Sequence, residues 1–383
     1  MGKRELLLIV CFVIVGAVVY QATAPPPDPG ARTFSFSRII EAARREISGN
    51  RARTERTVTS TEPIPADITE IRVVGNVAEV EVTGDKRPDV GTSLRVRSNA
   101  YDDDEAKKYA AETTLLTDHA GSSLVFRVKY PEGRHTGRQW AYLTLNVPSR
   151  IKVRVESGTG KLAISNVAAV ELPGSRGDTT LKNIAGRVSI VHRGGPVRIE
   201  NVETLKFTGR NTDLKVTSVR GDTSILMEQG GELEASQLAG AIDVESRNAD
   251  VKLSNLEPAR GPIRVNINGG SARLDGLKTD TRVDSRNSEV DIVMRGAAPV
   301  VIYTDGDDLA LTPPPDGYKL DAVVTGGRIA PETVVTELGL EHTGGADDEE
   351  ARASGSVKGG GPTITIRATR GDLTLRLPEK PKQ

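Results

Sequence analysis

The chain has 383 residues, and its 51 Lys and Arg residues nearly balance its 52 Asp and Glu residues. This balance argues against a nucleic-acid-binding protein, because such proteins usually carry a basic surface. Aromatic residues make up only 3% of the chain, whereas glycine contributes 39 residues. We therefore expect a core of small, branched side chains and few flat rings on which sugars or bases could stack. The single cysteine, Cys11, excludes an intrachain disulfide and a cysteine-based metal site.

An apolar run from Leu6 to Tyr20 follows the basic residues Lys3 and Arg4. When it is extended to Ala24, this run is just long enough to cross a bilayer as a helix. We predict a signal-anchor over residues 1–24 that contacts the membrane through residues 5–24. Pro25 follows the small residues of a possible cleavage site and disfavours cleavage there, although a cleaved signal remains an alternative. The basic flank places the N-terminus in the cytoplasm and the main domain outside it.

Residues 25–63 are predicted to form a Pro-rich linker with a short juxtamembrane helix between Ser35 and Ile47. The segment from Arg51 to Pro65 lacks an apolar pattern, and we expect it to be unstructured. Residues 64–150 are predicted to form an N-terminal β-rich cap. Within this cap, alternating apolar residues predict strands near 70–82, 94–97, 123–130 and 140–147, and acidic residues precede a predicted helix from Glu105 to Leu116.

A short pattern, apolar-x-apolar-x-polar-apolar, recurs at intervals of about 18 residues. Its polar position falls at residues 166, 183, 201, 218, 237, 255 and 276. A second strand lies between successive copies, as in Val188–Ile190 and Ile242–Val244. Alternate side chains of such strands point inward, and stacked coils bury a continuous core. The pattern predicts an all-β protein, a β-solenoid over residues 151–298 with about seven two-strand coils.

The predicted corners alternate between two sequences. Three corners contain glycine pairs and three contain Arg-Asn: Gly194-Gly195, Arg210-Asn211, Gly230-Gly231, Arg247-Asn248, Gly269-Gly270 and Arg286-Asn287. Glycine and asparagine both tolerate a positive φ, so both forms suit the same turn. We expect Arg210, Arg247 and Arg286 to line one edge, two layers apart. They are either solvated charges or a stripe that binds anions or polysaccharide.

Asparagines at the polar repeat position suggest a second structural device. Asn166, Asn183, Asn201 and Asn255 are expected to stack as an amide ladder. Residues 299–383 are predicted to form C-terminal strands and a cap. This region contains a Pro-rich loop at 312–317, a mobile acidic insertion from His342 to Ser356, and two strands over 363–377 that close the end.

Three pieces of the sequence carry a resemblance to a known family. They are Val155–Leu162 with its Glu-Ser-Gly-Thr-Gly-Lys core, the Gly-Asp corners, and Gly360–Arg367 closing on Gly371–Leu375. From about Ile64 to Leu377 the chain resembles the bacterial putative-adhesin family of unknown function, whose domains are called Toastrack-type. The resemblance implies a β-solenoid in the bacterial cell envelope. The family has no established catalytic residues, so the resemblance implies none here.

Motifs with known chemistry have structural explanations in this sequence. Arg-Gly-Asp occurs at 176–178, 220–222 and 370–372, in each case at a predicted corner before a strand. The segment 156–161 ends in Gly-Lys, as a phosphate-binding loop does. It leads into a strand, however, and it lacks the Ser or Thr that follows the lysine in such a loop. The four histidines lack metal-ligand spacing and are expected at the surface. Asp305, Asp307 and Asp308 are interpreted as a turn rather than a calcium site.

The sequence favours a non-enzymatic, membrane-anchored protein of the cell envelope that serves as a scaffold or an adhesin-like surface. It predicts a single pass through the bacterial inner membrane, no cofactor, no metal and no nucleic-acid partner. Envelope proteins or polysaccharide are the expected partners, and the oligomeric state is open. One alternative is an ectodomain that senses envelope stress or relays it through a membrane partner. The other is a carbohydrate-active β-helix enzyme, which would need clustered acid and base groups and sugar-stacking aromatics.

Overall fold

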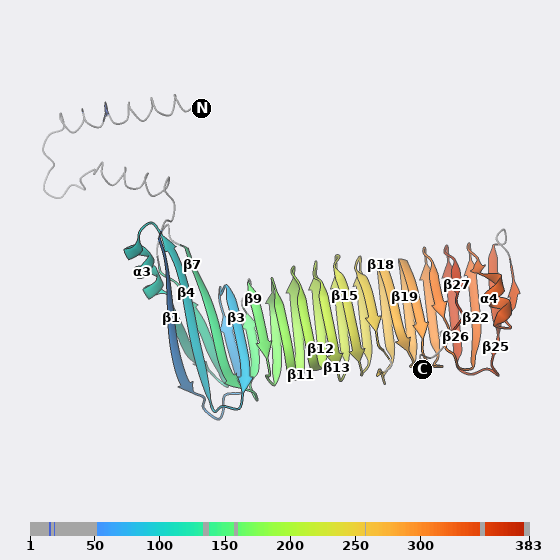
Figure 1. Ribbon diagram of the computed structural model, residues 1–383, viewed down its shortest axis with the longest axis horizontal. Helices are drawn as coiled ribbons and strands as arrows, with labels where there is room; N and C mark the ends of the chain where they lie inside the picture. The colour runs from blue at the N-terminus through green and yellow to red at the C-terminus, as the bar shows by residue number, and fades with distance from the viewer. Residues whose placement is uncertain are drawn as a thin grey trace. The chain divides into compact units, whose positions relative to one another are not determined.

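The computed structural model describes residues 15, 16, 19, 52–132, 138–156, 160–256, 258–344 and 349–378. The two helices with full bounds are α3 (Asp103–Glu112) and α4 (Glu332–Glu337), and the rest of the regular structure is strand (Figure 1). The strands are β1 (Ala52–Pro63), β2 (Glu70–Val74), β3 (Glu79–Asp85), β4 (Asp89–Ala100), β5 (Thr114–Ala120), β6 (Ser123–Lys129), β7 (Arg138–Pro148), β8 (Lys152–Glu156), β9 (Lys161–Ser165), β10 (Ala169–Ser175), β11 (Thr179–Arg193), β12 (Val197–Arg210), β13 (Leu214–Val219), β14 (Thr223–Glu228), β15 (Glu232–Leu238), β16 (Ile242–Arg247), β17 (Asp250–Ser254), β18 (Ile263–Leu277), β19 (Thr281–Met294), β20 (Val300–Asp305), β21 (Leu309–Thr312), β22 (Tyr318–Thr325), β23 (Ile329–Ala330), β24 (Glu341–Thr343), β25 (Glu350–Val357), β26 (Thr363–Thr369) and β27 (Leu373–Leu375). The protein is therefore all-β, as the repeat predicts.

The chain divides into two compact units. The smaller one comprises Met1–Glu55, Arg97–Ala111 and Glu132–Gln139, and it contains α3. Asp102 begins this helix by accepting a hydrogen bond from the backbone N–H of Glu105 through its carboxylate, at 2.8 Å. The larger unit comprises Arg56–Val96, Glu112–Pro131 and Trp140–Gln383, and it contains the strand stack described below.

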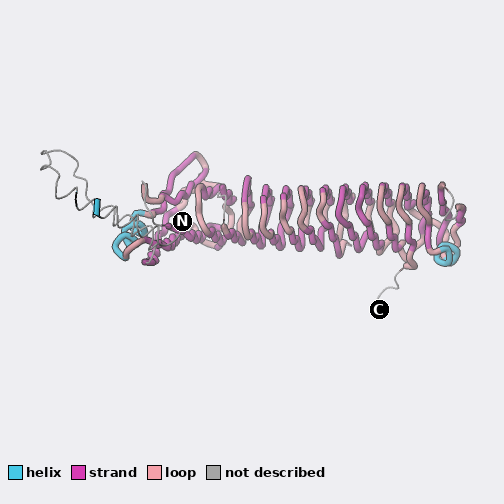
Figure 2. The backbone as a smooth tube through the Cα atoms, turned by 90° about the horizontal axis from the view of Figure 1, so that it is seen from above, coloured by secondary structure: helices cyan, strands magenta, loops and turns pink. Residues whose placement is uncertain are grey.

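The larger unit is a stack of layers, each made of two strands that lie on opposite faces (Figures 1 and 2). The first face runs through β6, β2, β8, β10, the second half of β11 and of β12, β14, β16, the first half of β18 and of β19, and β20. The second face runs through β7, β3, β9, the first half of β11 and of β12, β13, β15, β17, the second half of β18 and of β19, and β21. All of these pairings are parallel, so the stack is solenoid-like.

The inward positions of the repeat are those that its alternation predicts. In the layer of β12 and β13, for example, Leu205, Phe207, Leu214 and Val216 are each at most 2% exposed. The same column holds Ile199 in the preceding layer and Ala235 in the following one. The core is therefore a continuous column of small and branched side chains between the two faces, and no single layer encloses it.

Positive φ angles mark both corners of the layers from β9 to β19. At the corner that follows a first-face strand, Gly194 and Gly195 have φ values of 75° and 96°, whereas Asn211 has a φ of 50° in the next layer. The Gly-Gly and Arg-Asn corners are thus two solutions of one turn, as predicted. At the other corner, the polar repeat position is itself left-handed, including Ser218 (63°) and Gln237 (57°).

The amide ladder is confirmed over three layers. Asn183 donates from Nδ2 to Oδ1 of Asn166 at 3.1 Å, and Asn201 donates to Asn183 at 2.9 Å. The inclusion of Asn255 in this ladder was wrong. Ser218 and Gln237 occupy the same position in the two intervening layers, so Asn255 lies three layers beyond Asn201.

The ends of the stack are assembled out of chain order. The β2–β3 layer inserts between the β6–β7 and β8–β9 layers, because β2 pairs with both β6 and β8, and β3 with both β7 and β9. Likewise β26 pairs with both β20 and β22, and β27 with both β21 and β23. At one end, the β2–β3 layer therefore lies inside the β6–β7 layer. At the other end, the β26–β27 layer lies inside the β22–β23 layer.

This topology corrects the expectation that residues 64–150 and 299–383 only cap the repeat. Their strands continue the parallel stacking, so the stack holds more than the seven coils expected from residues 151–298. The two strands predicted over 363–377 are an internal layer rather than the end. The structure closes beyond them with β22 and with β25, which pairs antiparallel to β22 and to β24. An end cap and a layer inserted out of chain order both lack the 18-residue spacing of the repeat. The sequence alone therefore does not distinguish them.

Three local expectations were also wrong. Residues 52–63 form β1, which pairs with β4, because its Thr and Val residues favour an extended strand even though no side chain of β1 is buried. The helix expected to reach Leu116 ends at Glu112, and Leu115 and Leu116 join β5 against β6. The insertion expected to be mobile over 342–356 contains β24 and β25, although residues 345–348 lie outside the described residues.

The predicted anchor, spacer and juxtamembrane helix fall on residues 1–51, which lie outside the described residues except for 15, 16 and 19. Within the part of the chain that the structure describes, no helix has the length and apolar character needed to cross a bilayer.

Candidate functional site

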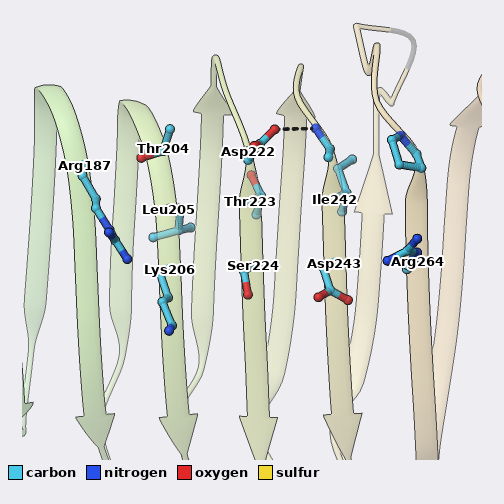
Figure 3. A pocket seen from close by; sticks show the side chains of 12 residues that line it. Arg187, Thr204, Leu205, Lys206, Asp222, Thr223, Ser224, Ile242, Asp243 and Arg264 are labelled. Carbon is cyan, nitrogen blue, oxygen red and sulfur yellow. Dashed lines mark hydrogen bonds between the residues drawn. The ribbon is translucent and has the colours of Figure 1, made fainter.

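A groove of about 430 Å³ crosses the first face of the stack. Figure 3 shows its side chains, which come from parallel strands of successive layers. It is lined by Arg187, Thr204, Leu205, Lys206, Asp222, Thr223, Ser224, Ala241, Ile242, Asp243, Pro262 and Arg264. Because the strands alternate, every second side chain here points outward while its neighbours fill the core.

The outward side chains form a polar row across the groove. In hydrogen-bonded register, Ser189, Lys206, Ser224, Asp243 and Arg264 stand side by side in successive layers. In Figure 3, Lys206, Ser224, Asp243 and Arg264 lie at nearly the same level on their strands. The row offers two cations and two hydroxyls, together with one carboxylate near its far end. Such a row can bind an extended polar ligand that runs along the stack.

The carboxylates of the groove do not form an acid–base pair. Asp222 Oδ1 accepts a hydrogen bond from the backbone N–H of Ala241 at 3.0 Å, the dashed line in Figure 3. Through this hydrogen bond, Asp222 stabilises the corner of the following layer. Asp243 stands apart on the outer face of β16. A glycosidase needs two carboxyl groups that face one bond of the substrate, and this arrangement does not supply them.

The three arginines singled out from the sequence lie on one edge of the first face. The register runs Arg210, Glu228, Arg247, Asn268, Arg286, so the arginines are two layers apart. Arg210 Nε donates to Oε1 of Gln229, and Arg247 forms a 2.7 Å ion pair with Glu245. Glu228 interrupts the positive charge between the first two arginines. Binding of an anion by this edge stays a prediction.

Sequence reasoning missed the densest part of this edge. Arg193 pairs in register with Arg210. In the layer before Arg193, Ser175 pairs with His192, so Arg176 occupies the position that corresponds to Arg193. Three successive layers therefore each carry an arginine at the same corner, and all three side chains are exposed. The repeat contained a signal, because an arginine precedes Gly177 and Gly194 just as Arg210 precedes Asn211.

The expectation that every histidine lies at the surface was wrong for His192. Its side chain is 1% exposed, and its Nδ1 lies 2.8 Å from the Oγ of Ser175, which is 3% exposed. The two residues face each other across adjacent layers inside the corner. A Ser–His contact of this length is also found in nucleophilic sites. Here both groups are buried in the stack, so we interpret the contact as structural.

Burial lowers the pKa of His192 below its ordinary value of 6.5, against an opposite effect of the backbone at Gly194 and Gly195. The unfolded chain therefore binds more protons than the folded chain as the pH falls through 6.5. We expect the melting temperature to fall between about pH 7.5 and pH 5.5, and this fall to be smaller in His192→Gln. Thermal melts of both proteins across this window test the prediction.

The carboxylates provide an internal comparison for that experiment. Ion pairs and hydrogen bonds with Arg72 and Lys152 lower the pKa values of Glu156 and Glu171, respectively, below their ordinary 4.5. Their contribution is present above pH 4.5 and is lost at more acidic pH in both proteins. Equal pH dependence of the two proteins above pH 5 would contradict the role assigned to His192.

The second face has its own groove of about 530 Å³, and several of its charges are paired. Lys215 contacts Glu234 at 2.8 Å in the next layer, and Asp213 Oδ1 accepts the backbone N–H of Glu232 at 3.2 Å. Nearby, Lys182 contacts Glu200 at 2.9 Å across one layer. These contacts join neighbouring layers, so we assign this groove a structural role.

The Arg-Gly-Asp sequences lie at corners, and side chains of the copies at 220–222 and 370–372 stabilise those corners. Arg220 pairs with Glu203 at 2.8 Å while Asp222 holds the next layer, as described above. Asp372 accepts hydrogen bonds from the backbone and side chain of Arg328 at 3.0 and 2.8 Å. The Asp305 turn also has a local explanation, because Arg370 donates two hydrogen bonds to Asp305 Oδ1.

The sequence matches a family model described as Toastrack DUF4097 over residues 79–312. The chain belongs to this family. The match spans both faces of the stack and the groove, whereas β1, β2 and the strands from β22 onward lie outside it. Toastrack membership agrees with the all-β, solenoid-like architecture. No curated protein matches the chain's sequence.

Several solved bacterial structures are similar to this Toastrack chain. A "putative cell adhesion protein" from Clostridium sporogenes ATCC 15579 is 10% identical with a TM-score of 0.19, over 85% of this chain and 100% of that one. A "putative adhesin" from Parabacteroides merdae ATCC 43184 is 11% identical with a TM-score of 0.26, over 86% and 98%. A "Putative lipid binding protein" from Parabacteroides distasonis ATCC 8503 is 12% identical with a TM-score of 0.24, over 86% and 98%.

Proposed function

We propose that this Toastrack chain is a non-enzymatic protein of the bacterial cell envelope whose stack is a scaffold or adhesion surface. The observation that carries the proposal is the groove of the first face. It is open and crosses successive layers. Its outward residues combine cations and hydroxyls with the carboxylate of Asp243, and they come from β11, β12, β14, β16 and β18. A surface of this kind suits reversible binding of an extended partner. It lacks the paired acid and base that glycan cleavage requires.

The proposal includes a location. The apolar run of residues 5–24 with its basic flank supports a single-pass anchor in the inner membrane, and the stack then lies on the extracytoplasmic side. From such an anchor, the linker of residues 25–51 connects the membrane to β1. This placement makes the stack available to other envelope components.

Fractionation and protease accessibility of cells test the location. We expect the full-length chain in the membrane fraction, resistant to extraction by salt and released by detergent. In spheroplasts, added protease should remove an epitope placed after Leu377 while sparing a cytoplasmic control protein. Recovery of most of the protein from the soluble cytoplasmic fraction would contradict the proposal. If the location is correct, cross-linking of intact cells followed by purification of the chain identifies its extracytoplasmic partners.

A further inference from the structure

We propose that the first face of this stack binds an acidic polysaccharide, and that the binding surface is centred on β11 and β12. We call this surface the cationic patch and define it by Arg176, Arg187, Arg193, Lys206 and Arg210. The inference rests on the proposed function, because it specifies the ligand of the same surface. It differs from the edge predicted from the sequence, since only Arg210 belongs to both.

The cationic patch is a local excess of positive charge in a protein whose net charge is −1. Its members come from the end of β10 and from β11 and β12, three layers that follow one another. Within the described residues, none of the five takes part in an ion pair. Some other cations of the same face are paired, as where Lys152 contacts both Glu70 and Glu171 at 2.9 and 2.5 Å.

Acidic residues mark the two sides of the patch. On the side toward β8, Glu171 stands beside Ser189, but its carboxylate is already bound by Lys152 and Arg154. On the other side, Glu228 stands beside Arg210, and Asp243 follows two layers after Lys206. Cations held together without acidic partners repel one another and gain when an anionic ligand binds. This unbalanced charge lacks a structural explanation in the stack.

The geometry of the patch suits a linear polyanion. Arg176, Arg193 and Arg210 recur once per layer, about 4.8 Å apart along the stack. Arg187 and Lys206 lie near the start of the first-face halves of β11 and β12. Six residues of strand separate Arg187 from Arg193 and four separate Lys206 from Arg210, roughly 20 and 13 Å. A polymer that runs along the stack therefore meets a cation in each of the three layers of the patch, whereas a compact anion would contact only one or two.

The space between these two groups of cations favours a polysaccharide. Ser189 and Thr208 place hydroxyls there, next to Val191, whose side chain is 38% exposed. Hydroxyls can exchange hydrogen bonds with sugar hydroxyls, and a small apolar side chain can contact the C–H groups of a sugar ring. Tyr303, the exposed aromatic residue of this face, lies several layers away. Without aromatic stacking, affinity must come from charge, which favours an acidic glycan over a neutral one.

Other polyanions fit this surface less well. Single-stranded nucleic acid gains much of its affinity from bases stacked on aromatic rings, and the patch offers none. An anionic bilayer would contact the whole face and would also meet Glu228, Glu245 and Asp243. A linear acidic glycan can follow the cationic patch without covering these carboxylates.

Binding of the full-length chain in mild detergent to polygalacturonic acid tests the inference. Its carboxylates repeat once per sugar, and dextran serves as the neutral comparison. The wild-type chain should bind polygalacturonic acid, should not bind dextran, and should bind more weakly as salt increases. The variants R176Q/R193Q/R210Q and R187Q/K206Q should each bind polygalacturonic acid at least about tenfold more weakly than the wild type does. The control K182Q/K215Q/K252Q changes three cations of the second face and should bind as the wild type does.

Three results would overturn the inference. The first is failure of the wild-type chain to bind polygalacturonic acid. The second is equal weakening in the control and in the patch variants, which would indicate general charge attraction. The third is stronger binding to phosphatidylglycerol vesicles or to single-stranded DNA than to polygalacturonic acid. Thermal melts check that every variant is folded. Fractionation, described above, tests the envelope location separately, so a protein that is correctly located but does not bind glycan refutes only this inference.

Discussion

Val216→Asp is expected to abolish the cooperative unfolding transition of the stack. Val216 is 1% exposed and stands in register between Ile199 in one adjacent layer and Ala235 in the other. A carboxylate at this position would lose its water and face only apolar side chains. We expect a cost of roughly 4 kcal/mol or more, a large part of the stability of a typical domain. Thermal melts followed by circular dichroism measure the loss.

Thr217→Asp is the matched control for that substitution. Thr217 is the next residue of β13, and its half-exposed side chain points to the outer surface. The same charge is therefore added one residue away on the opposite side of the strand. We expect its cost to be below about 1 kcal/mol, because the carboxylate stays solvated. Ile199→Asp repeats the test one layer earlier. Wild-type melting temperatures in both Val216→Asp and Ile199→Asp would mean that the inward register is wrong.

Gly231→Ala is expected to cost much more than Gly230→Ala, although both glycines belong to one corner. Both have positive φ, 99° for Gly231 and 80° for Gly230. A Cβ on Gly231 would lie 2.1 Å from the carbonyl oxygen of Thr212 in the preceding layer, whereas a Cβ on Gly230 would meet nothing closer than 3.8 Å. The pair therefore separates backbone conformation from the close approach of two layers.

The expected magnitudes follow from these contacts. Gly230→Ala should cost about 1–2 kcal/mol, the usual penalty for a left-handed alanine. Gly231→Ala should cost at least about 3 kcal/mol, because neighbouring layers must move apart. Denaturant unfolding of both variants gives the two free energies. Equal costs would show that the corner tolerates a wider spacing and that φ alone selects glycine there.

The candidate site was only partly predictable from sequence. The arginine edge was found because Arg210, Arg247 and Arg286 recur at alternate corners. Arg193 and Arg176 occupy the same edge, but they precede glycine corners, so the alternation of corner types hid them. Arg187 and Lys206 belong to no repeat pattern. They belong to the patch because β11 and β12 are adjacent strands whose outer faces form one surface. A single sequence does not reveal which outward residues are neighbours on such a surface.

His192 illustrates the same limit in the core. The sequence places this residue beside two glycines at a corner, where a polar side chain is normally exposed. In the structure, Ser175 of the preceding layer faces it and supplies a hydrogen-bonding partner at 2.8 Å. A buried polar residue is tolerated when it has such a partner. The partner is 17 residues away in the chain, and only the stacking of layers brings the two together.

The sequence by itself determined the all-β class, the inward positions of the repeat and the positive-φ corners. These features are local, since alternation and the choice of Gly or Asn depend on a few neighbouring residues. Only the tertiary structure decided the order of the layers. Each terminal segment pairs with strands on both sides, so that β2–β3 and β26–β27 become internal layers. Parallel strands of similar composition offer many acceptable neighbours, and the choice among them depends on packing across the whole stack.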